Sequence, residues 1–282
     1  MQILSQVDIS RLTSFQNSGI VPELVILESV QDASEFIRTA RPFRMLGRGS
    51  NSVIRPGVTE TVLVKVSPDA VDVQVDGNTL TVGAGIPVNR LMQMMQDAEL
   101  GGLEFSAGVP ASVGGMVAMN FGCWGYEISS FLSSVQVVLP SGEAVGMSPE
   151  ELKFGYRTSI FHHQPWIVMA ASFLLTPTPR LEIRKLVHDR IQERVSKQPL
   201  RGKTFGSTFK NPQNGFAGQI LDQLGYRGRD FGTLQLSDQH ANFMLNTHNA
   251  TLEDVQHAIE SICADVSTRL GVQLEPEVCF LP

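Results

Sequence analysis

The sequence predicts an α+β fold, and three observations lead to this prediction. Segments with period-two hydrophobicity and turn signals dominate the chain up to about residue 178. After this point, segments with helical spacing alternate with short strands. The glycines are unevenly placed, since 13 of the 25 lie between Gly47 and Gly125. We therefore expect a strand-rich, glycine-rich region over residues 1–178 and a mixed region over residues 179–282.

The first region contains one clear hairpin. Residues 71–75 alternate between apolar and polar, 76–78 form a turn, and 79–82 alternate again. A helix should follow, because Leu91, Met94, Met95 and Ala98 recur at helical spacing between Pro87 and Gly101. Residues 133–139 and 166–175 are predicted strands. The second is so apolar that we expect it to be buried on both faces.

The second region begins after the best linker candidate, Thr176–Pro179, whose two prolines favour extended backbone. A charged helix is expected next, with Leu186, Val187, Ile191 and Val195 on one face. Residues 216–224 predict a short helix, and 240–246 predict a strand. The last helix begins at the capping-box pair Thr251 and Asp254 and ends at Gly271.

Composition excludes several classes of protein. With 22 basic and 28 acidic residues, the net charge is −6, which argues against general nucleic-acid binding. The three cysteines are widely spaced and no metal-binding spacing occurs, so no metal is expected and a reduced, cytoplasmic compartment is favoured. The N-terminus shows no signal peptide. Residues 105–126 are uncharged, but their five glycines argue against a membrane helix.

Two short glycine turns could cradle a phosphate. They are Gly47-Arg48-Gly49-Ser50-Asn51, with added side-chain donors, and Gly83-Ala84-Gly85. Either one could equally be a plain tight turn. A dinucleotide-binding Rossmann turn at 83–88 is disfavoured, because Val88 takes the third glycine position and the preceding strand belongs to a hairpin.

A longer glycine-rich stretch, residues 108–122, has apolar residues but no regular period. Its backbone polar groups need partners. Two interpretations of this stretch stay open. A flat phosphorylated cofactor could lie along it and supply these partners, or the stretch could be a loop packed under other elements.

Seven blocks of sequence, in order, resemble one family, the UDP-N-acetylenolpyruvoylglucosamine reductases. The blocks lie at 46–51, 107–115, 119–122, 156–159, 206–212, 237–243 and 274–278. The resemblance is to the compact subtype, since the connection from 161 to 199 is short. Four features depart from the family pattern: the N-terminal element at 14–19, Ala111, where a glycine is common, Cys123-Trp124, and Cys279, which replaces a basic residue.

This resemblance implies an FAD-binding fold of the vanillyl-alcohol oxidase type over residues 1–178, with subdomains of about 1–56 and 57–178. A C-terminal α+β substrate-binding domain follows over 179–282. It implies a bacterial, cytoplasmic, NADPH-driven flavoenzyme that makes UDP-N-acetylmuramate for peptidoglycan. The expected partners are NADPH and a UDP-sugar, with no nucleic acid or membrane, and a monomer is favoured.

The same resemblance implies which residues hold the non-covalent FAD. They are Gly47, Arg48, Gly49, Ser50, Asn51, Gly108, Val109, Pro110, Ser112, Gly114, Gly115, Asn120, Gly122 and Arg157. Some flavoproteins of this wider fold attach flavin to cysteine. For Cys123 the favoured interpretation is nevertheless a buried thiol.

Three residues are expected to carry the chemistry. Arg157 would bind the substrate carboxylate and stabilise the enolate, because a guanidinium fork makes two parallel bonds. Ser207 would protonate the enolic carbon. Glu277 would complete the enolate site, with Glu275 as its rival. The expected substrate-binding residues are Tyr156, Lys210, Asn211, His240 and Asn242.

Two other functions stay open from the sequence. The chain could be an FAD-dependent oxidase or dehydrogenase of the same fold with another substrate. It could also be a non-catalytic subunit that binds flavin or a UDP-sugar, because a fold does not fix a function.

Overall fold

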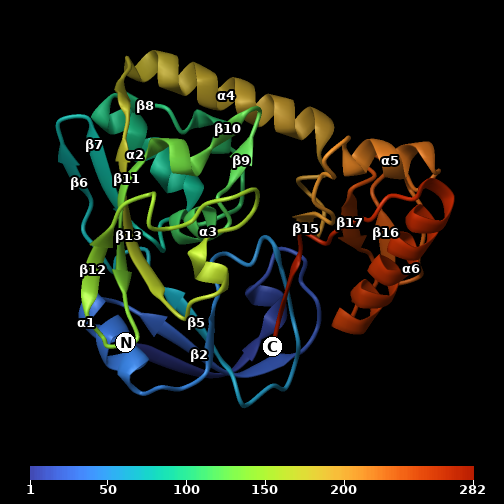
Figure 1. Ribbon diagram of the computed structural model, residues 1–282, viewed down its shortest axis with the longest axis horizontal. Helices are drawn as coiled ribbons and strands as arrows, with labels where there is room; N and C mark the ends of the chain where they lie inside the picture. Colours follow the sequence, from blue (N-terminus) through green and yellow to red (C-terminus); the bar gives the residue numbers. More distant parts are fainter. The chain divides into compact units, whose positions relative to one another are not determined.

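The computed structural model describes all 282 residues (Figure 1), and its internal contacts divide them into two compact units. Unit 1 comprises residues 1–5, 23–48 and 60–193. Unit 2 comprises residues 6–22, 49–59 and 194–282. Two N-terminal segments therefore complete the fold of the C-terminal unit.

Unit 1 contains a small sheet in the order β1-β2-β5-β3, of which β1 continues into unit 2. Both β2 and β3 run parallel to β5. The helix α1 connects β2 to β3, as parallel strands require, and begins at the Ser29 cap. Its apolar face, with Phe36, packs against Val64 of β5. The bounds are β1 Gln2–Asp8, β2 Ile20–Leu27, α1 Val30–Arg38, β3 Phe43–Met45 and β5 Val62–Val66.

A larger antiparallel sheet, in the order β12-β11-β13-β7-β6, forms the rest of the unit's framework. The predicted hairpin is confirmed, with Asp76 opposite Thr79. The central strand β13 is buried on both faces over most of its length, as expected. The bounds are β6 Gln74–Asp76, β7 Thr79–Gly83, β11 Leu132–Val138, β12 Ala144–Met147 and β13 Ile167–Leu174.

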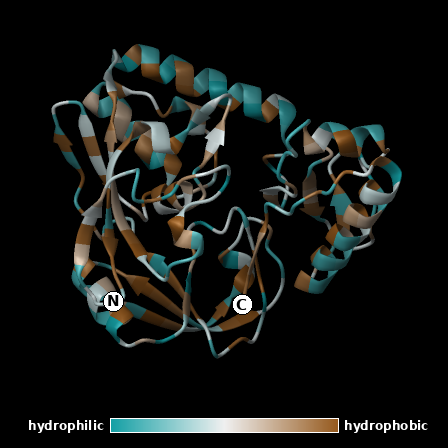
Figure 2. Cartoon of the chain, viewed as in Figure 1, coloured by the Kyte–Doolittle hydropathy of each residue, from teal (hydrophilic) through white to brown (hydrophobic).

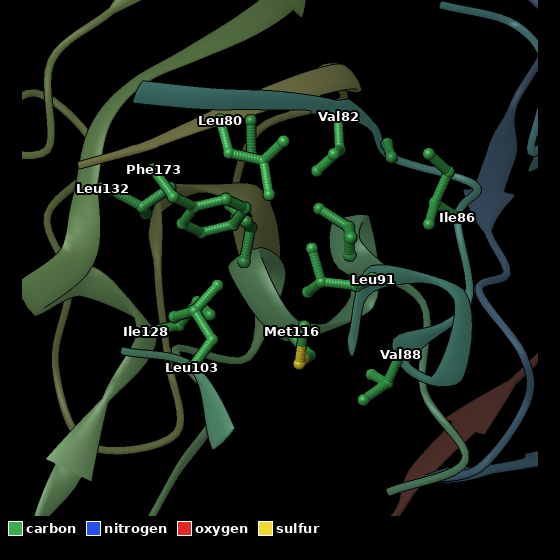
Figure 3. Close-up of a cluster of buried hydrophobic side chains, with 14 of the residues drawn as sticks. Leu80, Val82, Ile86, Val88, Leu91, Leu103, Met116, Ile128, Leu132 and Phe173 are labelled. Carbon is green, nitrogen blue, oxygen red and sulfur yellow. The ribbon is translucent and has the colours of Figure 1, made fainter. Parts of the chain in front are cut away.

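The helices α2 (Val88–Ala98) and α3 (Val113–Ala118) share one apolar core with β7 and β13. Figure 3 shows Leu91, Met116 and Phe173 pointing into this core. The sequence missed α3, because its six residues are too few to establish a helical period. The helix α2 ends at Ala98 instead of continuing to Gly101, because the next residue, Glu99, adopts a left-handed φ of 53°.

The segment Thr176–Pro179, the best linker candidate in the sequence, pairs over its first two residues. β14 (Thr176–Pro177) bonds to β8 (Leu100–Gly101), and such a two-residue edge pairing tolerates a proline. The helix α4 (Arg180–Lys197) follows. Only part of its predicted stripe is buried: Ile191 packs against the core of unit 1, whereas Val195 is 50% exposed. Figure 2 shows α4 as largely hydrophilic.

Unit 2 is built on a sheet in the order β15-β17-β16, with α5 and α6 packed in the same apolar core. The strand β17 is shorter than the expected 240–246. The helix α6 has the predicted Thr251–Asp254 capping box and a left-handed Gly271 at its end. A separate parallel pair joins β4 and β18. The bounds are β4 Ser52–Ile54, β15 Thr204–Ser207, α5 Ala217–Gln223, β16 Leu234–Leu236, β17 Phe243–Asn246, α6 Leu252–Leu270 and β18 Cys279–Leu281.

None of the helices combines the length and the apolar character that a membrane crossing needs.

Candidate active site

The first glycine turn follows β3 and crosses from unit 1 into unit 2. A Cβ atom on Gly47 would lie 2.8 Å from the Ser112 hydroxyl oxygen, so this position needs glycine. Gly49 adopts a left-handed φ of 64°. The exposed Arg48 between them makes no hydrogen bond or ion pair within the chain. The turn therefore places the positively charged Arg48 side chain next to backbone that a ligand could approach closely.

The second glycine turn is joined to the stretch 108–122 by backbone hydrogen bonds. The Ala84 carbonyl accepts from Gly114 N–H at 2.8 Å, and the Ile86 carbonyl accepts from Val113 N–H at 2.9 Å. Ser112 caps α3 by accepting from Gly115 N–H. Protein groups thus satisfy much of this backbone, which the sequence left without a partner. The cofactor contacts expected at Gly108, Val109, Pro110, Ser112, Gly114 and Gly115 stay predictions.

Arg157 lies in a tight turn within unit 1. The backbones of Gly155 and Thr158 exchange two hydrogen bonds of 3.1 and 3.2 Å, and Arg157 adopts a left-handed φ of 55° between them. Its Nη1 donates to the Gly122 carbonyl at 2.8 Å. The guanidinium carbon lies 5.7 Å from the Phe121 ring centroid and 5.4 Å from that of Tyr156. The guanidinium is therefore held in a defined direction.

Asn120 holds this turn in place through side-chain hydrogen bonds. The sequence predicts it only as a cofactor contact. The side chain is 1% exposed, and its Nδ2 donates to the Gly155 carbonyl at 3.0 Å and to the Glu127 carboxylate at 2.9 Å. Its Oδ1 accepts from Ser129 N–H. On the other side of the turn, the Ser159 hydroxyl donates to the Ala118 carbonyl at 2.6 Å. No motif in the sequence had indicated Glu127 or Ser159 as supports of Arg157.

A short hairpin follows Gly122. It joins β9 (Gly122–Cys123) to β10 (Tyr126–Glu127) through Trp124 and Gly125, both with left-handed backbone. The Arg190 guanidinium of α4 lies 4.5 Å from the Trp124 ring centroid. The Cys123 thiol donates to the Phe105 carbonyl at 3.0 Å. These contacts anchor the strand that carries the Gly122 carbonyl.

Ser207 ends β15 directly after a break in the strand register. The pairing with β17 shifts between Thr204 and Ser207, and Gly206 adopts a left-handed φ of 84°. Such a bulge re-aims the next side chain. The half-buried Ser207 hydroxyl makes no hydrogen bond within the chain. A Cβ atom on Gly206 would lie 3.8 Å from the Ser50 carbonyl oxygen, so the bulge lies beside the predicted cofactor turn.

Glu277 is held next to Ser207 by backbone contacts. Its N–H donates to the Thr208 carbonyl at 2.8 Å, and its carbonyl accepts from Asn51 Nδ2 at 2.9 Å. The Asn51 carbonyl in turn accepts from Cys279 N–H at 2.9 Å. These contacts bring Ser207, Glu277 and Asn51 close together within unit 2.

Glu277 and Lys210 both lie close enough to Cys279 for their charges to influence its pKa. The Lys210 ammonium pairs with the Glu275 carboxylate, whose side chain is 70% exposed. Burial raises the pKa of the Cys279 thiol, and the negative charge of Glu277 raises it further, while Lys210 lowers it. Cys279 is therefore a neutral thiol near both charged groups, in the place where the family resemblance leads one to expect a cation.

Three of the predicted substrate-binding residues, Asn211, His240 and Asn242, have structural partners in unit 2, whereas Tyr156 lies beside Arg157 in unit 1. Asn242 is 3% exposed; its Oδ1 accepts from Phe209 N–H at 3.0 Å and its Nδ2 donates to the Phe209 carbonyl at 2.8 Å. Asn211 Oδ1 accepts from Ala217 N–H at the start of α5. His240 Nδ1 accepts from Asn242 N–H at 3.2 Å, and burial followed by Arg227 lowers the His240 pKa. Their contacts with substrate stay predictions.

Comparisons with known proteins agree with this arrangement. Residues 22–148 match a model described as an FAD binding domain, and residues 198–281 match the C-terminal domain of UDP-N-acetylenolpyruvoylglucosamine reductase. A reductase of that name from Anaplasma marginale is 35% identical over 94% of this chain and 89% of its own length. A second, from a Thermotoga species, has the same identity and the same coverage of both chains.

The chain belongs to the UDP-N-acetylenolpyruvoylglucosamine reductase family.

A solved structure of this family, from Thermus caldophilus, superposes with a TM-score of 0.84 at 33% identity and covers both chains completely. The expected fold is therefore confirmed as an FAD-binding α+β fold followed by the reductase family's C-terminal domain.

Proposed function

We propose that this chain catalyses the FAD-dependent, NADPH-driven reduction of UDP-N-acetyl-3-O-(1-carboxyvinyl)-glucosamine to UDP-N-acetylmuramate. Membership of the reductase family over 94% of the chain carries this conclusion. The structure supplies a supporting observation within unit 2. The turn residue Asn51 bonds to the backbone of Glu277, and Gly206, next to Ser207, lies against Ser50.

The residues present fit a cofactor such as FAD. Consecutive N–H groups in a glycine turn bind anions, and the Arg48 guanidinium there has no partner within the chain. The residues expected to hold FAD are therefore the turn 47–51 and the segment 108–122. FAD bound there would supply the transfer of a hydride from NADPH to the terminal vinyl carbon of the sugar substrate.

Arg157 acts on the charge that this reduction creates. Hydride addition at the vinyl carbon places negative charge next to the substrate carboxylate. A fixed guanidinium stabilises such charge without reorganising at the moment of reaction. Because the Gly122 carbonyl and two aromatic rings hold Arg157, its direction is set before substrate binds.

Ser207 donates the proton that completes the product. Its Oγ–H transfers to the enolic carbon, and the resulting alkoxide regains a proton from solvent. The carbanion-like enolate is a strong acceptor, which compensates for the weak acidity of a hydroxyl. Glu277 acts on the enolate in this proposal either as a protonated carboxyl or through a bridging water, because a bare carboxylate would repel the charge that builds up. Tyr156, Lys210, Asn211, His240 and Asn242 are assigned to the sugar-nucleotide side.

The two half-reactions separate these roles. Under anaerobic conditions NADPH should bleach the flavin absorbance near 450 nm, and the enolpyruvyl sugar should restore it. Ser207→Ala should bleach normally and fail to recover with substrate. Recovery at the wild-type rate would remove Ser207 as the proton donor. Recovery by oxygen alone in the unmodified protein would contradict the proposed substrate.

We further propose that this reaction takes place in a bacterial cytoplasm, with the chain acting as a monomer. Residues 1–178 would then bind FAD, as subdomains of about 1–56 and 57–178, and 179–282 would bind substrate. Sedimentation velocity of the flavin-loaded protein should give the mass of one 30.8 kDa chain. A species of twice that mass would contradict the monomer.

A further inference from the structure

Two basic side chains without an acidic partner lie at the end of the small parallel sheet. Lys65 is the fourth residue of β5 and is half-buried, and Arg48 comes three residues after β3. The Leu46 N–H donates to the Val64 carbonyl at 2.8 Å, so the chain leading to Arg48 runs directly beside Lys65. Neither side chain makes a hydrogen bond or an ion pair within the protein.

The face on which Lys65 lies explains why it lacks a counter-charge. Side chains alternate along a strand, and Val64 and Val66 pack in the apolar cluster of α1. Lys65 therefore lies on the opposite face, beside Ile26 of β2. Burial lowers the pKa of Lys65, and the nearby charge of Arg48 lowers it further. A half-buried cation next to a second cation destabilises the protein unless an anion binds there.

The location suits a ligand. The strands β2, β3 and β5 are parallel, so their carboxyl ends lie at the same end of the sheet. Ligands bind at this end of parallel sheets. The glycine turn 47–51 follows the carboxyl end of β3. The residues after β5 support the second glycine turn, because a Cβ atom on Gly85 would lie 2.5 Å from the Ser67 carbonyl oxygen. Lys65 thus lies between two turns that can approach a phosphate closely.

We infer that Lys65 and Arg48 form a phosphate-binding pair that takes the diphosphate of FAD. This inference rests on the proposed function, since it assumes FAD as the cofactor. Both residues lie inside the segment that matches the FAD binding domain. A lysine contributes a point charge and an arginine a planar fork, and together they match the two charges of a diphosphate. The other phosphate source is the 2′-phosphate of NADPH, which the experiment distinguishes.

The experiment measures cofactor binding to the flavin-free protein and needs no turnover. FAD and riboflavin are each titrated by the quenching of their fluorescence. Lys65→Met should raise the FAD dissociation constant by about 10- to 100-fold, the loss expected for a charge-assisted contact. Riboflavin, which carries no phosphate, should bind equally to both proteins. Lys65→Arg should restore most of the FAD affinity. Lys185→Met on exposed α4 removes the same charge and should change nothing.

Stability supplies a second measurement. Without FAD, Lys65→Met should unfold at a higher temperature than the unmodified protein, because the unpaired charge is gone. Unchanged FAD binding by Lys65→Met would overturn the inference. So would a variant with normal FAD affinity and a raised KM for NADPH but not for NADH, since that result places the pair at the 2′-phosphate. Failure of the enolpyruvyl sugar to reoxidise the flavin would contradict the proposed function alone, since FAD binding is measured separately.

Discussion

The Asn120 carboxamide donates to the Gly155 carbonyl at 3.0 Å, across 35 residues of sequence, and so fixes the turn that carries Arg157. The same nitrogen donates to the Glu127 carboxylate at 2.9 Å. Because both acceptors share one buried NH₂ group, the position of the Arg157 turn depends on Asn120 being an amide. This makes Asn120 a positioning residue for the proposed enolate site.

Replacing the amide by a carboxylate tests this relationship. Asn120→Asp places a second carboxylate beside Glu127 and removes the donor to Gly155. We expect flavin reoxidation by the enolpyruvyl sugar to slow by about 10- to 100-fold, the loss expected for hydrogen bonds to a charged group. Flavin reduction by NADPH should change little.

A second substitution provides the control. In Asn120→Asp with Glu127→Gln, the glutamine amide can donate to the new carboxylate, so the repulsion between two carboxylates is removed although the donor to Gly155 stays lost, and part of the rate should return. Asn78→Ala, in the exposed turn between β6 and β7, should behave as the unmodified protein. A single Asn120→Asp variant with a normal reoxidation rate would show that the turn holds its place without this amide.

Arg157 itself should be far less replaceable. Arg157→Ala should reduce turnover by about 10²- to 10³-fold, because the fixed positive charge at the enolate is lost. Arg157→Lys keeps the charge but loses the planar fork and its contact with the Gly122 carbonyl, so it should recover only part of the rate. Steady-state kcat decides; a value within threefold of the unmodified enzyme for Arg157→Ala would exclude the proposed role.

Glu275 and Glu277 form a matched pair for locating the second enolate contact. Glu275 is exposed and paired with Lys210, and exposed ion pairs contribute little. Glu277 is tied to the Asn51 and Thr208 backbone beside Ser207. We expect Glu277→Ala to lower kcat by about 10²-fold or more, because no donor to the enolate remains, and Glu275→Ala to leave it nearly unchanged. The reverse order would make Glu275 the residue that acts on substrate.

Local features of the sequence predicted much of the fold. The hairpin turn at 77–78, the capping box at Thr251 and the stop at Gly271 all depend on residues within a few positions of one another. Such signals act over a few neighbouring residues and can be recognised without tertiary contacts. The short α3 and the pairing of 176–177 could not be recognised this way, because both depend on contacts with distant segments.

The candidate site shows the same division. Motifs indicated Ser207, Arg157 and Glu277 because each lies in a recognisable block of sequence. The supports of these residues, Glu127 and the paired amide of Asn120, are joined by contacts between segments separated in sequence. Lys65 also gave no signal, because a lysine in a predicted strand is normally a solvated side chain, and only the parallel register places it beside the glycine turn.

The attachment of the flavin can be tested through Cys123. Its thiol donates to the Phe105 carbonyl at 3.0 Å, so it already has a structural partner. We expect acid precipitation of the yellow protein to leave all of the flavin in the supernatant. Cys123→Ser, which can keep the hydrogen bond, should bind FAD with unchanged affinity. Colour that stays with the precipitate of the unmodified protein and is absent from that of Cys123→Ser would establish a covalent link.

The stability of the protein should fall on mild acidification because of His240. Burial lowers the His240 pKa and the positive charge of Arg227 lowers it further, while a backbone hydrogen bond and the charge of Asp222 act in the opposite direction. The unfolded chain, with an ordinary histidine pKa of about 6.5, therefore binds a proton at a pH where the folded protein does not. The contribution of neutral His240 to the free energy of unfolding is complete above about pH 6.5 and is lost as the pH falls towards the folded-state pKa.

Urea unfolding at pH 7.5 and pH 5.5 measures this pH dependence of the free energy of unfolding. The dependence should be smaller for His240→Gln than for the unmodified protein. The exposed His248→Gln should keep the full dependence. Equal pH dependence in all three proteins would mean that His240 does not change its protonation on unfolding.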